Sequence, residues 1–322
     1  MDLKQSCSEM NAVDALLGGR VRRDAGRDVR RIERGGAAYP LHLATVAAAP
    51  EALYVRGHVC DDDALAVAIV GSRRATPYGL EVAERLAAEL AARGVTVVSG
   101  LARGIDTAAH QGALSAGGRT IAVLGSGVDV IYPSENRRLA DRIAECGALV
   151  SQFVPGTRPL PYNFPERNRV IAGLSLGVVV VEAAERSGSL ITAGFAAELG
   201  REVMAVPGRI TSVESRGTHR LIQDGAALVQ DGEDVIAALP ARWRACVGAA
   251  VLPGDRVEDA APVGEDHGRL LGALGEDPIG IDDIIERSGV ASGRATALLL
   301  ELELDGRIRQ IEGKRFVRMR GR

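Results

Sequence analysis

The sequence predicts an α/β protein in which a doubly wound, mostly parallel sheet is followed by a small C-terminal winged-helix domain. Six short apolar runs alternate with helix-like stretches of about 10–16 residues, the pattern of repeated strand–helix units. The runs are continuous, as expected for strands covered on both faces. Aromatic residues make up only 3% of the chain, so the core must be built from Ala, Val, Leu and Ile, which disfavours an aromatic-rich β-sandwich.

The central domain is expected to span residues 39–240. Strands are predicted at the apolar runs, with right-handed crossover helices between them. The runs are LAVAIVG (65–71), VTVVSG (95–100), TIAVLG (120–125), ALVSQF (148–153), LGVVVVEA (176–183) and EVMAVPG (202–208).

Residues 1–38 form an arginine-rich N-terminal segment with little amphipathic pattern. Its run RVRRDAGRDVRRIER (20–34) holds seven arginines against three acidic residues. Opposite charges three residues apart, as in Asp24 and Arg27, favour a solvated helix or tail. A nucleic-acid-binding arm is the alternative interpretation.

The C-terminal part changes character twice. Residues 241–266 are predicted to be an acidic linker rich in proline and glycine. Residues 267–322 hold three helix-like pieces and then a short β-hairpin turning at Gly313 and Lys314, an order that predicts a winged helix with a basic tail. The apolar positions of the hairpin are Ile308, Ile311, Phe316 and Val317.

Composition and charge limit the function classes. The 322 residues carry a net charge of −3, which argues against wholesale polyanion binding. Arginine makes up 37 of the 39 basic residues; it suits phosphate recognition, although genome composition is the simpler explanation. The four cysteines lie far apart, so no metal site is expected. No leader or membrane-spanning stretch is visible, so we expect a cytoplasmic protein with reduced thiols and no membrane partner.

Candidate site residues follow the apolar runs, because ligands of open α/β sheets bind at the carboxyl ends of the strands. Glycines there let a phosphate approach the backbone closely, and the N-terminus of the next helix attracts it. For any single loop, a tight turn with nothing bound is the alternative. The residues singled out are Gly71, Ser72 and Arg73 after the first run, and Ser99, Gly100, Arg103 and Gly104 after the second.

The loop after the fourth run is stiffened by prolines and presents an aromatic residue among polar ones. Phe164 is followed by Arg167, Asn168 and Arg169. An aromatic ring beside guanidinium groups is what single-stranded DNA requires, with stacking for the bases and charge for the backbone. Alternatively, Phe164 packs in the core and the arginines pair with acids such as Glu182. Another polar loop follows the fifth run, at Ser187, Gly188 and Ser189.

No catalytic constellation is visible, and we expect no catalytic residue and no cofactor. Neither a Gly-x-Gly-x-x-Gly fingerprint nor a Gly-x-x-x-x-Gly-Lys-Ser/Thr loop is present in the expected place, which disfavours nicotinamide and nucleoside-triphosphate chemistry. His110 stands one helical turn after Asp106, but a structural histidine is the favoured interpretation.

Several of these blocks resemble, in order and spacing, the DNA-processing protein A family, also called Smf. The blocks include AIVGSRRATPYG, VVSGLARGIDTAAHQGAL, NFPERNRVIAGLS and VVVVEAAERSGSLITA, and the likeness covers residues 39–239. It implies an extended Rossmann-like domain that binds single-stranded DNA without sequence preference, forms homodimers and loads RecA recombinase onto DNA during natural transformation and recombination. Single-strand-binding protein is a further implied partner. Members are not known as enzymes.

Carried over residue by residue, the resemblance places the family's DNA-contacting positions on the loops already singled out. It implies that Phe164 stacks on a base, that Arg73 and Arg167 meet phosphates, and that Asp106 braces its loop. The implied set is Gly71, Ser72, Arg73, Ser99, Gly100, Arg103, Gly104, Phe164, Arg167, Asn168, Arg169, Ser187, Gly188 and Ser189.

The sequence also departs from the family pattern. Residues 1–38 are too short for the N-terminal helical domain of many members, and His219 stands where many have Asn. The lysines that some members bring to the pocket are absent, so arginines must supply that charge.

Two other classes of function stay open. One is a nucleotide-processing enzyme of the lysine-decarboxylase-like Rossmann group, although the Pro-Gly-Gly-x-Gly-Thr loop of that group is missing. The other is a winged-helix regulator that binds duplex DNA. Its candidate recognition helix, around residues 292–304, offers only Arg294 before a run of leucines, while residues 305–322 carry seven basic residues against two acids.

Overall fold

The computed structural model describes residues 29–248 and, in the C-terminal part, residues 270, 272–274, 279–290, 295, 298–299, 302, 308–311 and 315–318. Contacts within the chain divide it into two compact units, Met1–Pro253 and Gly254–Arg322. Each unit is described by itself.

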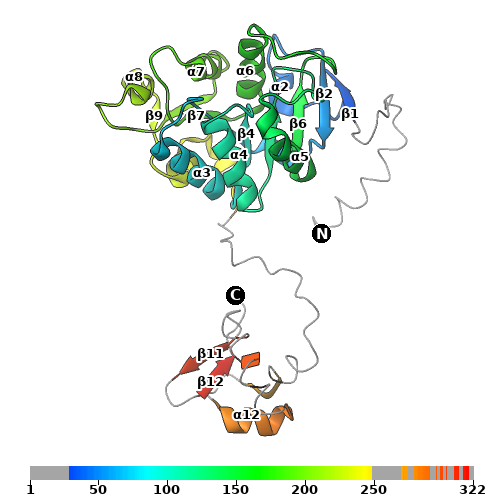
Figure 1. Cartoon of the computed structure of the whole chain (residues 1–322), viewed down its shortest axis with the longest axis vertical. Coiled ribbons are helices and arrows are strands. Elements are labelled where there is room, and N and C mark those ends of the chain that lie inside the picture. The colour runs from blue at the N-terminus through cyan, green and yellow to red at the C-terminus, as the bar shows by residue number, and fades with distance from the viewer. Residues whose placement is uncertain are drawn as a thin grey trace. The chain divides into compact units, whose positions relative to one another are not determined.

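The first unit is built on a nine-stranded sheet in the order β1-β2-β6-β5-β4-β3-β7-β8-β9 (Figure 1). The pairs from β6 through β9 are parallel, whereas β2 pairs antiparallel with β6 and β1 with β2. All six predicted runs form strands, which confirms the mostly parallel α/β fold. These are β3 (Ala66–Val70), β4 (Thr96–Ser99), β5 (Thr120–Val123), β6 (Ala148–Ser151), β7 (Gly177–Val180) and β8 (Glu202–Ala205).

The sequence pattern missed the three remaining strands, β1 (Val29–Glu33), β2 (Ala52–Gly57) and β9 (Ala227–Leu228). The expectation of a solvated helix or tail is wrong for residues 29–33, because this stretch pairs along its whole length with β2. Ile32 packs against the core, so a tertiary partner overrides the local charge pattern. The expected pair of Asp24 and Arg27 lies outside the described residues.

Helices cover both faces of the sheet (Figure 1). On one face, α3 (Pro77–Ala91), α4 (Ile105–Ser115) and α5 (Arg137–Cys146) bury a core of small aliphatic side chains. On the other, α2 (Leu41–Ala44), α6 (Asn163–Leu174) and α7 (Gly188–Glu198) do the same. Adjacent residues of one strand serve opposite cores, as Val97 and Val98 do in β4. This two-sided burial explains the continuous apolar runs.

The strand order reverses at β3. Strands β4, β5 and β6 follow on one side of it and β7, β8 and β9 on the other, so the loops after β3 and β7 diverge from this point. Such a switch point is where open α/β sheets bind ligands.

The first unit ends with α8 (Arg216–Gln223), α9 (Gly232–Ala238) and α10 (Ala241–Arg244). Trp243 and Val247, inside the range expected for the linker, pack against the core beneath α3 and α4. Among the described residues, no helix has the length and apolar character needed to cross a bilayer.

The second unit contains β10 (Ile279–Gly280), α12 (Ile281–Ser288), β11 (Ile308–Ile311) and β12 (Arg315–Arg318), with strand order β10-β12-β11. The predicted hairpin is confirmed, since Gln310 pairs with Phe316 across antiparallel strands; its turn residues lie outside the described part. Three leucines of the candidate recognition helix, Leu298, Leu299 and Leu302, are buried core residues.

Candidate nucleic-acid interface

The loop after β3 is held at both ends by one residue of the loop after β7. The N–H of Ser72 donates to the backbone carbonyl of Glu182 at 2.8 Å. The buried carboxylate of Glu182 accepts hydrogen bonds from the N–H of Thr76 at 2.9 Å and from its hydroxyl at 2.6 Å. Thr76 is also the N-cap of α3. The loop between these anchors exposes Arg73 and Arg74.

Glu182 was expected only as a possible partner of Arg167 or Arg169, and this expectation is wrong because its carboxylate holds Thr76. A Glu directly after the fifth apolar run was the signal available in the sequence. Its partner lies 106 residues away, so no local pattern identifies it.

The loop after β4 packs beneath the loop after β3. The Ile105 N–H donates to the Ser72 carbonyl at 3.2 Å. Gly104 has a φ of +75°, and a Cβ there would meet that same carbonyl and lie 3.1 Å from the Arg73 Cα. Ser99 is fully buried, and its hydroxyl donates to the Ile69 carbonyl at 2.6 Å. Ser99, Gly100 and Gly104 therefore shape the loop from inside.

Arg167 is also internal. Its side chain is only 4% exposed, and one terminal nitrogen donates to the carbonyls of Gly100 at 2.5 Å and Val123 at 2.7 Å. These bonds join the carboxyl ends of β4 and β5. Burial lowers the pKa of Arg167 to about 10, against the opposing effect of Asp106, so the guanidinium stays charged at neutral pH. The geometry fits a brace better than the phosphate contact expected from the sequence.

Two buried titratable groups of α4 lie near this guanidinium. Burial raises the pKa of Asp106, opposed by Arg167 and by the N–H of Ala102, which Asp106 accepts at 3.3 Å. Burial lowers the pKa of His110 to about 3, and its Nδ1 lies 2.7 Å from the Thr120 hydroxyl. A neutral, enclosed histidine fits a structural role.

Phe164 brings the loops together at the carboxyl edge. Its half-buried ring lies 5.0 Å from the guanidinium carbon of Arg73 and 5.8 Å from that of Arg167, both within cation–π range. The Tyr132 ring lies 6.1 Å away, and a Cβ on Gly125 would lie 2.9 Å from the Phe164 ring. Arg73, Phe164 and Arg167, named separately from the sequence, therefore form one cluster.

The remaining predicted residues divide into two groups. At the start of α7, the Ser187 hydroxyl accepts from the Ser189 N–H at 3.3 Å, and the Asn168 amide donates to the exposed Gly188 carbonyl at 3.3 Å. The loop before α7 is thereby held next to α6 at the carboxyl edge of the sheet. Arg169 turns elsewhere: it lies 4.2 Å from the Phe195 ring and 3.8 Å from the Glu198 carboxylate, so it packs between α6 and α7.

The loop after β3 exposes positive charge at the carboxyl edge of the sheet, through Arg73 and Arg74. Neither Arg73 nor Arg74 forms an ion pair with a carboxylate of any residue in the described part of the chain. Arg103 differs, because Glu135 binds it through two hydrogen bonds of 2.6 and 2.8 Å. His219 lies 3.0 Å from the Gly208 carbonyl after β8.

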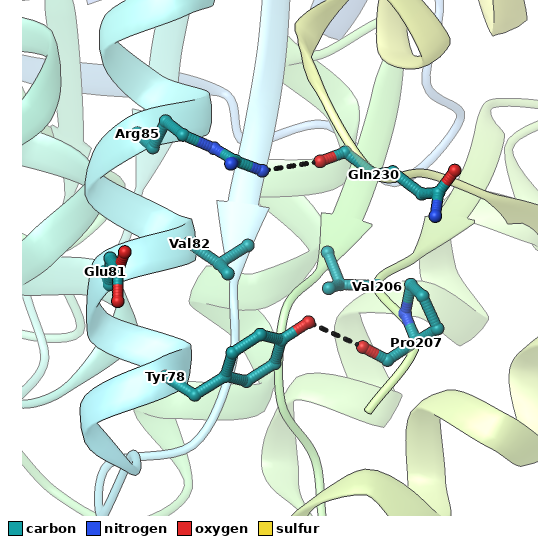
Figure 2. A pocket seen from close by; sticks show the side chains of 7 residues that line it. All are labelled: Tyr78, Glu81, Val82, Arg85, Val206, Pro207 and Gln230. Atoms are coloured by element: carbon teal, nitrogen blue, oxygen red, sulfur yellow. Dashed lines mark hydrogen bonds between the residues drawn. The ribbon is translucent and has the colours of Figure 1, made fainter. Parts of the chain in front are cut away.

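A separate hollow of about 260 Å³ lies beside α3, and Figure 2 shows its lining. The Tyr78 hydroxyl donates to the Pro207 carbonyl at 2.8 Å, and Arg85 donates to the Gln230 carbonyl at 2.7 Å. Both bonds tie α3 to the loops after β8 and β9. They support the helix that begins at the first loop.

Fold and site together define a class: a Rossmann-like α/β domain that carries a winged helix and gathers arginine and aromatic side chains at a strand-end edge. Two family models match the chain, "DNA recombination-mediator protein A" over residues 30–240 and "DprA winged helix domain" over residues 255–314. The chain belongs to this DprA/Smf family.

Relatives and solved structures agree with this assignment. Protein Smf of Escherichia coli is 43% identical over 292 residues, covering 88% of this chain and 75% of the relative. DNA processing protein DprA of Streptococcus pneumoniae is 48% identical over 199 residues, covering 62% and 70%. The X-ray structure of the S. pneumoniae protein matches with a TM-score of 0.62 and 42% identity, over 72% of this chain and 78% of that one. A Helicobacter pylori structure, concerned with that protein's single-stranded DNA binding mode, matches with a TM-score of 0.58 and 31% identity, over 65% and 94%.

Proposed function

We propose that this protein binds single-stranded DNA, without sequence preference, along the carboxyl edge of the first unit's sheet. The observation that carries the proposal is the stack of Arg73 on Phe164, which offers at one point an aromatic face and a guanidinium that pairs with no carboxylate within the described residues. The single-stranded DNA binding mode of the H. pylori relative supports the same ligand.

In this proposal the predicted residues take two kinds of role. Gly71, Ser72 and Arg73 receive a phosphate, Phe164 stacks on a base, and Asn168 of α6 contacts the neighbouring DNA backbone together with Ser187, Gly188 and Ser189 at the start of α7. The buried Ser99, Gly100 and Arg167 and the half-buried Gly104 hold these groups in place, and Arg169 supports α6 from the side of α7.

The further steps are proposed from the family alone. We infer that the protein, as a homodimer in the cytoplasm, loads RecA recombinase onto single-stranded DNA in the presence of single-strand-binding protein, during DNA uptake and recombination. We infer no enzymatic activity. In the second unit, Arg294 is the only basic residue in the sequence of the candidate recognition helix, which disfavours the duplex-regulator alternative.

A salt series with the full chain tests DNA binding. Labelled oligo-dT is titrated at several salt concentrations, and unlabelled blunt duplex is used as competitor. We expect the single strand to bind more tightly. Arg73→Gln should flatten the slope of log affinity against log salt by about 0.7, the contribution of one phosphate. The control is Arg142→Gln, which removes an exposed charge from the second half of α5. Equal affinity for duplex together with an unchanged slope in Arg73→Gln would sink the proposal.

RecA loading needs its own test. RecA-dependent ATP hydrolysis is followed on oligo-dT coated with single-strand-binding protein. We expect this protein to shorten the lag, and Arg73→Gln to do so less well. Tight DNA binding without any effect on the lag would reject the mediator role while leaving the DNA-binding role standing.

A further inference from the structure

A second aromatic side chain extends the edge beyond Phe164. Tyr132 is 46% exposed, and its ring is tilted by 46° to the Phe164 ring at a centroid distance of 6.1 Å. Sequence reasoning did not single it out. A phenol ring half open to solvent, beside a base-stacking residue, offers a face to the neighbouring base of a flexible single strand.

A guanidinium lies on the loop next to the turn that carries this second ring. Arg103 precedes the N-terminus of α4, an 11-residue helix. Hydrogen bonds to Glu135, three residues after Tyr132, raise the pKa of Arg103, and the Tyr132 phenol acts weakly in the same direction. The turn that carries Tyr132 and the loop that carries Arg103 thus bring an aromatic face and a positive charge to the same part of the edge.

Buried hydrogen bonds fix the distance between the loop of Arg103 and the turn of Tyr132. The buried side-chain amide of Asn136 donates to the Leu101 carbonyl and to the Thr107 hydroxyl, both at 2.9 Å. Thr107 in turn donates to the Ala102 carbonyl at 2.7 Å. These bonds tie the turn that carries Tyr132 to the loop that carries Arg103, so the two groups are presented together without reorganisation of the backbone.

Glu135 occupies the guanidinium in the free protein. Its two oxygens accept from Nε and a terminal nitrogen of Arg103, and the two side chains are 54% and 59% exposed. Exposed ion pairs of this kind contribute little free energy, so an incoming phosphate can displace the carboxylate.

We propose that Tyr132 and Arg103 form a second nucleotide subsite, in which the base of one nucleotide stacks on Tyr132 and its phosphate replaces Glu135 on Arg103. Glu135 then acts as an attenuator, because the protein must release it before the full length of the edge binds DNA. This inference rests on the proposed DNA-binding function and assigns the next nucleotide along the strand.

Charge removal tests the attenuator. Oligo-dT affinity is measured in a salt series for Glu135→Gln and for Glu233→Gln. Glu233 is the matched control, since its carboxylate also binds one arginine, Arg93, but at the C-terminal end of α3. We expect Glu135→Gln to bind about threefold or more tightly than Glu233→Gln at moderate salt, with a slope steeper by about 0.7.

The gain in oligo-dT affinity caused by Glu135→Gln must depend on Arg103. In an Arg103→Gln background, Glu135→Gln should add no more than Glu233→Gln does. If Glu135→Gln and Glu233→Gln behave alike in the wild-type background, or if the full gain persists without Arg103, the attenuator is refuted.

The stacking partner is tested separately. Tyr132→Leu should lose about 5- to 150-fold in oligo-dT affinity, and Tyr132→Phe should recover most of it, because the ring carries the stacking. Unchanged affinity in Tyr132→Leu would overturn the second subsite. Wild type and Phe164→Ala are measured in the same assay. If wild type does not bind oligo-dT, the proposed function is rejected. If binding is weakened by Phe164→Ala but unchanged by Tyr132→Leu and Glu135→Gln, only this inference is rejected.

Discussion

The carboxylate of Glu182 accepts two hydrogen bonds from Thr76, one from its N–H and one from its hydroxyl. Because the Glu182 carbonyl also binds Ser72, both ends of the Arg73 loop depend on one residue at the point where the strand order reverses. The loop geometry is thereby coupled to the core of the sheet.

Thr76→Val should destabilise the first unit by about 0.5–2 kcal/mol, because it removes an N-cap and leaves one oxygen of a buried carboxylate without its donor. Thr76→Ser keeps the hydroxyl and should stay close to wild type. Urea unfolding followed by circular dichroism measures both. Equal stability of the two variants would show that the Glu182 bond contributes nothing.

Gly104→Ala should cost clearly more than Gly94→Ala. Both glycines have positive φ, +75° and +80°, so both substitutions strain the backbone by about 1–3 kcal/mol, and the ψ of −126° at Gly104 places it outside the left-handed helical region. Only at Gly104 would the new Cβ also meet the Ser72 carbonyl, whereas no atom lies within 4 Å at Gly94. The difference between their unfolding free energies therefore measures the contact between the two loops together with the extra backbone strain at Gly104. Equal costs would mean that the loops part easily.

Arg167→Met should destabilise the first unit by about 3–5 kcal/mol, because it leaves Asp106 buried without its compensating charge and frees two backbone carbonyls. Adding Asp106→Asn should recover part of the loss. Urea unfolding gives the free energies. An Arg167→Met protein as stable as wild type, but with a weaker salt dependence of DNA binding, would return Arg167 to the role of a phosphate ligand.

Acid should destabilise the protein partly through His110. Its pKa is about 3 in the folded state against 6.5 in the unfolded chain, so below pH 6.5 the unfolded state binds the extra proton. Stability then falls as pH falls, by up to about 1.4 kcal/mol per pH unit for this one group. The raised pKa of Asp106 has the opposite sign, because its folded state holds the proton more strongly.

Comparing His110→Asn with wild type separates the two groups. Unfolding free energies measured from pH 7 to pH 4.5 should fall less steeply for His110→Asn. Parallel curves for the two proteins would contradict a buried, neutral His110.

The sequence predicted the parts of the fold that follow from local pattern. Strands β3 to β7 were visible because each is buried on both faces, β8 because its apolar run includes the buried Met204 and Ala205, and the winged hairpin because its apolar positions flank a turn. Strand β1 was not visible in the sequence, because its arginines indicate a solvent-exposed segment. Only its pairing with β2 shows that it is a strand. Edge strands of this kind carry charge by necessity and lack a distinctive apolar signature.

The candidate site was predictable as a set of loops but not as an arrangement. Glycine and arginine at strand ends identified the edge, and the aromatic block identified Phe164. The sequence could not show that Arg167 points inward or that Glu135 holds Arg103. Both depend on partners 32 or more residues away and on burial, which only the folded chain sets.

The ring of Phe164 is the most direct test of the account. Oligo-dT affinity at one moderate salt concentration is compared for Phe164→Leu and Phe195→Leu. Phe195 is the matched control because Arg169 lies over its ring as Arg73 lies over Phe164, but between α6 and α7. The account predicts a loss of about 1–3 kcal/mol for Phe164→Leu and wild-type affinity for Phe195→Leu. Wild-type affinity in a folded Phe164→Leu protein would contradict single-stranded DNA binding at this edge.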